Sequence, residues 1–327
     1  MKKIIILFCA VVILISIALL FNSKKEDELK KIKVAEVTHS IFYTPMYVSD
    51  ALGYFKNEGL DVEIILTPGA DSVSAAVLSG DVQIGFCGSE QSIYIYNEGA
   101  IDYLVNFAGL TKRDGSFLIS REKQDNFDLS HLIGKDIIGG RKGGMPAMTL
   151  AYTLHEFGIE EDEVNIDTSI AFASMSGAFI GGTGDYVALF EPNASELVSQ
   201  GYGYIVASIG ELGGVVPYTA FNAKKSYIEK NPDVIKSFSK AIQKGLDYTF
   251  LHTDSEIANI IRDYFPDTSY NDLVKTIKNY RNIDSWFKTT YISKEGFNHI
   301  QEIMKYNKVL EKEAPYKLLV NNTYNHE

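Results

Sequence analysis

The chain has 327 residues, of which 46% are hydrophobic, 22% charged and 12% aromatic. This composition is typical of a globular protein, and the length suits about two compact domains with a full core in each. The formal net charge of −11 argues against a nucleic-acid partner, because phosphate binding needs clustered Lys and Arg. Two cysteines and six scattered histidines give no disulfide framework, no Cys-based metal site and no zinc-hydrolase spacing. The sequence therefore predicts no metal ion and no cofactor.

The first 23 residues are typical of a membrane anchor or a signal segment. Lys2 and Lys3 precede an apolar run over residues 4–21, which as a helix would span about 27 Å, close to a bilayer core. The lysines favour a cytoplasmic N-terminus, so the rest of the chain would be exported. The small-residue pattern before Ser23 is weak for cleavage, and the run ends without the Cys of a lipoprotein. We predict an uncleaved anchor rather than a cleaved signal, followed by a charged tether over residues 24–33.

Strand and helix signals alternate from residue 33 onward. Thr44 and Pro45 open the first helix, as an N-cap and a proline at the first helical position, and the helix stops near Gly53. Alternating apolar side chains predict a strand over residues 60–66. The predicted order up to residue 110 is strand 33–38, helix 44–52, strand 60–66, helix 71–79, strand 82–86, helix 89–98 and strand 104–110.

A second block repeats this alternation. Segment 80–86 is echoed by segment 184–190, because in each a helix is followed by Gly-Asp and a strand. Strands joined by helices predict parallel sheets covered on both faces. After residue 222 the chain is mainly helical, so the predicted fold class is α/β, with two doubly wound α/β lobes and a helical C-terminal extension. The predicted elements of this block are strands 136–139, 164–168, 186–190 and 203–208, and helices 146–158, 174–180 and 192–200.

Three short segments carry a resemblance to a known family. Residues 42–48 are FYTPMYV, residues 52–63 are LGYFKNEGLDVE, and residues 78–85 are LSGDVQIG. In these motifs the chain resembles type II periplasmic binding proteins of ABC importers. Within that family it is most similar to the group that binds nitrate, alkanesulfonate, taurine and thiamine-precursor pyrimidines. The resemblance covers residues 34–251, and the last 60 or so residues match only as helical packing.

The resemblance implies a fold, a place for the ligand and a set of partners. It implies two lobes joined by two crossing strands, with lobe one at residues 34–113 plus 220–327 and lobe two at residues 114–219. A small-molecule ligand would lie between the lobes, at the carboxyl ends of strands and the amino ends of helices, and hinge closure would bury it. The protein would be a monomer on the extracytoplasmic face of the membrane, docking with an ABC permease and, through it, an ATPase.

Polar, aromatic and glycine residues that follow predicted strands form the candidate ligand site. Glycines let a backbone approach a ligand closely, and free N–H groups at helix starts can hold its polar atoms. Residues 139–146, GGRKGGMP, are the strongest local signal, although they match neither a P-loop nor a dinucleotide fingerprint. The predicted ligand-binding residues are His39, Ser40, Phe42, Tyr43, Gly88, Ser89, Ser116, Gly143, Gly144, Met145, Met148, Phe172, Ser174, Glu191 and Tyr218.

Some of these residues also have ordinary structural explanations. Ser89 can cap its own helix, and Phe42 or Tyr43 can pack against the start of the first helix. Glu191 suits a ligand N–H group, amino group or cation rather than a bare anion, but it can also complement a helix dipole. Cys87 is expected to be a small buried residue rather than a nucleophile, because the sequence fixes no histidine beside it. No catalytic residue is predicted.

The leading functional hypothesis is a non-enzymatic solute receptor of an ABC importer. Glu191 and the abundant aromatic residues favour a pyrimidine-like ligand over nitrate or a simple sulfonate. One alternative is an enzyme on the same fold, similar to desulfinases, menaquinone-pathway enzymes or pyrimidine synthases. The synthases use a Cys-rich segment and a cytosolic setting, which this sequence does not suggest. The other alternative is an anchored sensor domain that binds a ligand and signals through a partner.

Overall fold

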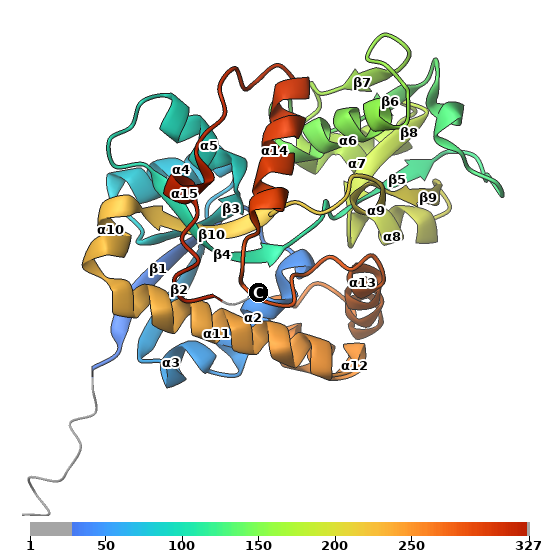
Figure 1. Ribbon diagram of the computed structural model, residues 1–327. Coiled ribbons are helices and arrows are strands. Elements are labelled where there is room, and N and C mark those ends of the chain that lie inside the picture. Colours follow the sequence, from blue (N-terminus) through green and yellow to red (C-terminus); the bar gives the residue numbers. More distant parts are fainter. Residues whose placement is uncertain (1–27, 326–327) are drawn as a thin grey trace, which may run out of the picture.

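The computed structural model describes residues 28–325, which form two separate five-stranded sheets with helices packed around them (Figure 1). The first sheet has the order β2-β1-β3-β10-β4. Strands β1, β2 and β3 run parallel, and β10 runs antiparallel to both of its neighbours. The bounds of these strands are β1 (Lys30–Glu36), β2 (Leu60–Leu66), β3 (Ile84–Gly88), β4 (Leu104–Thr111) and β10 (Thr219–Lys224).

The second sheet is built in the same way from the middle of the chain. Its order is β7-β6-β8-β5-β9, in which β6, β7 and β8 are parallel and β5 is antiparallel to β8 and β9. The α/β class is therefore confirmed, but both sheets are mixed rather than parallel, because β5 and β10 follow passages of the chain from one sheet to the other. The bounds are β5 (Ser116–Ser120), β6 (Asp136–Ile138), β7 (Asn165–Asp167), β8 (Tyr186–Phe190) and β9 (Tyr204–Ser208).

Helices connect the strands and cover both sheets, as predicted. Around the first sheet lie η1 (Ile41–Tyr43), α2 (Thr44–Ala51), α3 (Tyr54–Asn57), α4 (Ala70–Ser79), α5 (Glu90–Asn97) and α10 (Lys225–Lys230). The second sheet carries η2 (Leu129–Leu132), α6 (Met145–Glu156), η3 (Phe172–Ser174), α7 (Met175–Ile180), α8 (Asn193–Ser199) and α9 (Ile209–Leu212). The C-terminal helices are α11 (Pro232–Leu251), α12 (Asp254–Ile261), η4 (Arg262–Tyr264), α13 (Tyr270–Asn282), α14 (Lys294–Tyr306) and α15 (Tyr316–Leu319).

Element starts differ from the prediction where tertiary partners intervene. Strand β1 begins at Lys30 and pairs with β2 from its first residue, so the predicted tether over residues 24–33 runs into the fold. Thr44 is the first residue of α2 rather than its cap, and its hydroxyl donates to the Ile41 carbonyl at 2.6 Å. Ser40 instead caps the short turn η1 by accepting from the Phe42 amide.

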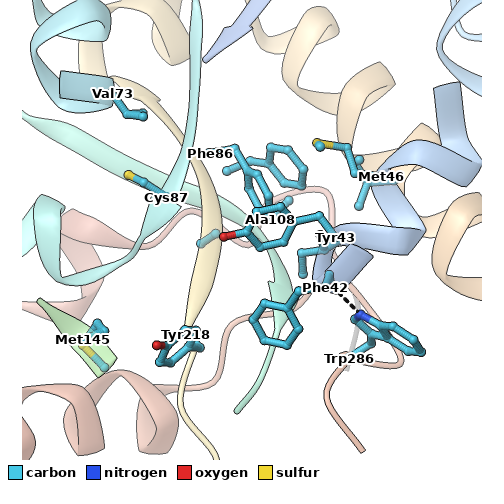
Figure 2. Close-up of a cluster of buried hydrophobic side chains, with 14 of the residues drawn as sticks. Phe42, Tyr43, Met46, Val73, Phe86, Cys87, Ala108, Met145, Tyr218 and Trp286 are labelled. Carbon is cyan, nitrogen blue, oxygen red and sulfur yellow. Dashed lines mark hydrogen bonds between the residues drawn. The ribbon is translucent and has the colours of Figure 1, made fainter. Parts of the chain in front are cut away.

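The C-terminal helices are packed against the first sheet and also reach the second. The predicted apolar stripe of α11, which includes Phe238 and Ile242, is fully buried against α2 and β4. Helix α14 lies between the two sheets in Figure 1 and contacts both α5 and α6. After α13, the buried Trp286 donates its indole N–H to the Phe42 carbonyl at 2.8 Å (Figure 2). The C-terminal extension thus fixes the loop that follows β1.

No helix within residues 28–325 is both long enough and apolar enough to cross a membrane. The predicted anchor or signal segment, residues 1–23, lies outside the described residues.

Candidate functional site

A cavity of about 950 Å³ lies between the two sheets. The first sheet contributes residues 37–43 after β1 and Gly88 at the end of β3, and the second contributes residues 140–146 after β6 and residues 190–193 at the end of β8. In open α/β sheets, ligands bind outside the carboxyl ends of the parallel strands, which is where this cavity opens. Residues 264–268, between η4 and α13, line it from a third side.

Two passages of the chain join the sheets beside this cavity. Residues 112–115 lead from β4 to β5, and residues 209–218 lead from β9 back to β10. The two passages are hydrogen-bonded to each other: the Val216 amide donates to the Lys112 carbonyl at 3.0 Å, and the Tyr218 amide donates to the Thr111 carbonyl at 3.0 Å. Paired connections of this kind can act as a hinge between two rigid bodies.

Most of the predicted site residues line the cavity. They come from six different segments of the chain, which the fold brings together at one place. The residues are His39, Ser40, Phe42, Tyr43, Gly88, Gly143, Gly144, Met145, Phe172, Glu191 and Tyr218.

Two predicted serines lie away from the cavity, because their hydroxyls are used inside the protein. Ser89 is fully buried, and its Oγ donates to the Pro217 carbonyl at 2.5 Å, which ties α5 to the second passage between the sheets. Its hydroxyl therefore neither caps α5 nor lines the cavity. Ser116 is also buried, and both its amide and its hydroxyl donate to the Asp114 carboxylate.

Met148 and Ser174 are the other two predicted residues that do not line the cavity. Met148 lies one turn along α6 from Met145, but its side chain points into the core, where the Tyr94 hydroxyl contacts its Sδ at 3.8 Å. Ser174 ends the short turn η3 and is exposed. Of the predicted pair in this segment, only Phe172 reaches the cavity, and its ring meets Phe190 edge to face.

His39 holds the end of β1 to the segment that precedes α13. Its Nδ1 lies 2.9 Å from the buried carboxylate of Glu36, which also accepts a hydrogen bond from the Tyr47 hydroxyl at 2.6 Å. Its Nε2 donates to the Tyr264 carbonyl at 2.8 Å, and its ring stacks on Phe265 with the ring centroids 4.7 Å apart. Because both ring nitrogens face acceptors, the hydrogen bond to Glu36 raises the pKa of His39 above its usual 6.5.

We expect His39→Ala to loosen residues 264–268. A histidine with a raised pKa in the folded state stabilises the fold below about pH 6.5, and this contribution is lost as the pH rises through the folded-state pKa. The variant should therefore lower the melting temperature more at pH 6 than at pH 8.5, and should speed amide exchange in residues 264–268. Hydrogen exchange followed by mass spectrometry would test this, with His155→Ala as the control, because His155 pairs with the exposed Glu160 instead of a buried carboxylate. Equal exchange in both variants would contradict the expectation.

Glu90, the first residue of α5, is a buried acid on the wall of the cavity. Its Oε1 accepts a hydrogen bond from the Gln91 side-chain amide at 3.3 Å, and its Oε2 has no hydrogen-bond partner among residues 28–325. Burial raises the pKa of this carboxyl from 4.5 to about 7. The carboxylate lies over Gly88: a Cβ at that position would be 2.0 Å from Oε2, so only glycine leaves room for it.

Glu191, in contrast, is a buried acid whose oxygens are occupied. Its Oε2 accepts from the Ser195 amide at 2.9 Å, and its Oε1 accepts from the Ser195 hydroxyl and from the Asn279 side chain. The Tyr280 hydroxyl accepts a hydrogen bond from the Glu191 amide at 3.0 Å. The carboxylate thus binds the first turn of α8 and joins it to α13, while the residue still lines the cavity.

Comparison with known proteins assigns this chain to a family. A model of the NMT1/THI5-like family matches residues 41–255. The protein YtlA of Bacillus subtilis (strain 168), described as a candidate binding protein, is 44% identical over 299 residues, which cover 91% of this chain and 90% of YtlA. The chain belongs to the NMT1/THI5-like family.

Two further proteins are similar to this chain, one in sequence and one in structure. The 4-amino-5-hydroxymethyl-2-methylpyrimidine phosphate synthase of Candida albicans (strain WO-1) is 23% identical, with coverage of 84% of this chain and 88% of the synthase. The alkanesulfonate-binding protein SsuA of Xanthomonas axonopodis pv. citri, solved with MOPS bound, has a TM-score of 0.71 at 14% identity, over 90% of this chain and 99% of SsuA. This NMT1/THI5-like chain therefore has the fold of periplasmic binding proteins.

Sequence reasoning about this NMT1/THI5-like cleft missed residues that depend on tertiary structure. Glu90 follows the predicted residue Ser89, but nothing in the sequence shows that its carboxylate is buried with one oxygen lacking a hydrogen bond from the described residues. Residues 264–268 belong to the helical C-terminal part, where strand-end patterns give no signal. Residues 68–71, at the start of α4, also line the cavity and follow β2 in the same way that the predicted loops follow their strands, so this signal was available.

The cavity wall combines aromatic rings with few buried charges. Phe42 and Tyr218 meet edge to face with centroids 6.1 Å apart, and Phe190 lies 5.7 Å from Phe42. Figure 2 shows Tyr218 between Phe42 and Met145. Such a wall suits a small organic ligand with a flat or apolar body and a few polar groups. Among residues 28–325, no group of three or more His, Cys, Asp or Glu side chains could hold a metal ion.

Proposed function

We propose that this protein is the substrate-binding component of an ABC importer. It captures a small organic ligand, pyrimidine-like or sulfonate-like, in the cavity between the sheets. The observation that carries the proposal is the cavity itself. The strand ends of both sheets line it, and the two passages of the chain between the sheets lie beside it. Family membership and the shared fold of solved binding proteins agree with this function.

The proposal includes motion, location and partners. The two lobes, residues 34–113 with 220–327 and residues 114–219, would rotate about the two passages to close on the ligand. The closed form would dock as a monomer with a permease on the extracytoplasmic side, and ATP hydrolysis would occur in a separate subunit. The segment before residue 28 would hold the receptor at the membrane.

We expect binding without turnover. The distant relationship to a pyrimidine phosphate synthase makes an enzyme the second candidate, and Cys87 would be its obvious nucleophile. However, Cys87 is fully buried, and burial raises the pKa of its thiol to about 12, so a reactive thiolate would not form at neutral pH. Its Sγ instead accepts a hydrogen bond from the Asn222 side chain at 3.4 Å.

A thermal-shift screen of the full-length protein in mild detergent would test the proposal. The panel would hold sulfonates, nitrate, amino acids, pyrimidines, thiamine and flavins. A ligand that binds only the folded state at 100 times its Kd should add about 2.7 kcal/mol and raise the melting temperature by roughly 5 °C or more. The bound compound should be recovered unchanged after incubation. Chemical conversion of a compound that binds, absent in Cys87→Ala, would favour the enzyme instead.

A further inference from the structure

The cavity holds two kinds of charged side chain, which differ in their burial. Arg141 and Lys142 are exposed at the rim, and Arg141 lies near Asp71, another exposed residue. The charged lining residues that are buried, Glu90 and Glu191, are both acidic. A ligand that is enclosed by this cavity therefore meets buried carboxylates, whereas solvent screens Arg141 and Lys142, and the partly exposed His39 is already paired with Glu36.

Glu90 differs from Glu191 because one of its carboxylate oxygens, Oε2, accepts no hydrogen bond from the described residues. Glu191 is fully bonded to Ser195 and Asn279, whereas the Oε2 of Glu90 has no partner among the described residues. An acid needed only for the dipole of α5 would act as well from an exposed position. A buried carboxylate oxygen without a hydrogen bond costs free energy, and such a cost is characteristic of binding sites.

A second polar atom without a partner lies on the same wall. The Tyr218 hydroxyl is buried beside the Asp114 carboxylate, and no hydrogen bond of good geometry satisfies it among residues 28–325. Burial raises the pKa of Tyr218 well above its usual 10, the Asp114 carboxylate adds to this rise, and the charge of Glu90 makes a smaller contribution in the same direction. Together they present an ionisable acceptor and a hydroxyl beside the aromatic wall of Phe42 and Phe190.

We infer that Glu90 is a specificity-determining ligand-binding residue, whose carboxylate accepts a hydrogen bond from an N–H group of the ligand. The ligand class is a flat nitrogen compound with an amino, amidine or protonated ring nitrogen. Bare anions such as sulfonate or nitrate are selected against, because they would face an unscreened carboxylate. This inference rests on the proposed binding function and assigns its ligand chemistry. Tyr218 then bonds a neighbouring polar atom of the same ligand.

Probes with N–H donors and an anionic probe of matched shape would test this in the full-length protein at pH 8. Benzamidine and 4-amino-5-hydroxymethyl-2-methylpyrimidine carry N–H groups, and benzenesulfonate has the ring of benzamidine with an anionic head. Isothermal titration would compare wild type with Glu90→Gln and with Glu191→Gln. Glu98→Gln, an exposed position at the other end of α5, is the matched control.

We expect wild type to bind an N–H probe at least tenfold more tightly than benzenesulfonate. Glu90→Gln should weaken the binding of that N–H probe at least tenfold and should reduce the difference in affinity between the N–H probe and benzenesulfonate. Glu98→Gln should bind both probes as wild type does. Preferential binding of benzenesulfonate by wild type, or unchanged N–H probe affinity in Glu90→Gln, would overturn the inference and leave the receptor function in place. Loss of N–H probe binding only in Glu191→Gln would also overturn it. If neither probe class binds and the denatured protein releases no small molecule, the proposed function itself fails, and the inference falls with it.

Discussion

Gly245→Ala is expected to destabilise the protein by about 3 kcal/mol, with a fall in melting temperature of roughly 5–10 °C. Gly245 lies in the middle of α11, where the helix crosses α2. A Cβ at this position would be 2.0 Å from the Ser49 Oγ and 2.2 Å from the Pro45 carbonyl oxygen. The second contact is with backbone, so it can be relieved only by moving the helices apart. The gain in helix propensity, about 1 kcal/mol, is too small to offset this.

A matched glycine separates crowding from helix propensity. Gly177 lies in the interior of α7 with no atom within 4 Å of a Cβ position, so Gly177→Ala should be neutral or slightly stabilising. Chemical denaturation of both variants would measure the difference. Adding Ser49→Ala to Gly245→Ala should restore only part of the stability, because the Pro45 carbonyl remains. Equal stability of Gly177→Ala and Gly245→Ala would show that α11 and α2 are not in close contact at this point.

The same helix shows what the sequence could and could not predict. The apolar spacing of α11 predicts its buried face, because that pattern follows from helix geometry alone. The need for glycine at residue 245 could not be predicted, since it depends on a helix about 200 residues earlier in the chain. In the same way, the alternation of strands and helices predicts the α/β class, whereas β5 and β10 make both sheets mixed through pairings that only the completed fold creates.

The candidate site follows the same division. The glycine segment over residues 143–145 and the loop after β1 were predictable, because chain position alone places them at strand ends. Ser89 is a good helix cap by residue type. Its hydroxyl instead donates to the carbonyl of Pro217, which lies far away in the sequence. Met148 has the spacing of a lining residue, yet Tyr94 lies on that side of α6. Side-chain direction, rather than sequence position, decides these cases.

Glu90 connects the stability of the protein to its proposed ligand, because the unpartnered carboxylate should weaken the unliganded fold. Its pKa rises from 4.5 to about 7 on burial, so the folded state holds this proton more tightly than the unfolded state does. The resulting stability is complete below about pH 4.5 and is lost as the pH rises towards 7. At pH 8 the full penalty is roughly 3 kcal/mol. The ionisable groups around the carboxyl are Tyr43, Cys87, Tyr94 and Tyr218, none of which carries a positive charge.

Glu90→Gln should therefore stabilise the protein in the absence of ligand by about 1–3 kcal/mol at pH 8, and by much less at pH 5. The amide keeps the shape of the side chain and removes the charge, although its own unpaired atoms reduce the gain. Urea unfolding at pH 5, 6.5 and 8 would measure the difference in stability from wild type. Burial also raises the pKa of Asp114, to about 6, and taking the difference between variant and wild type removes the contribution of that group. A variant that is more stable but binds the N–H probe less tightly would show that the buried charge is retained for recognition. A variant that is less stable at every pH would instead show that the carboxylate supports the fold.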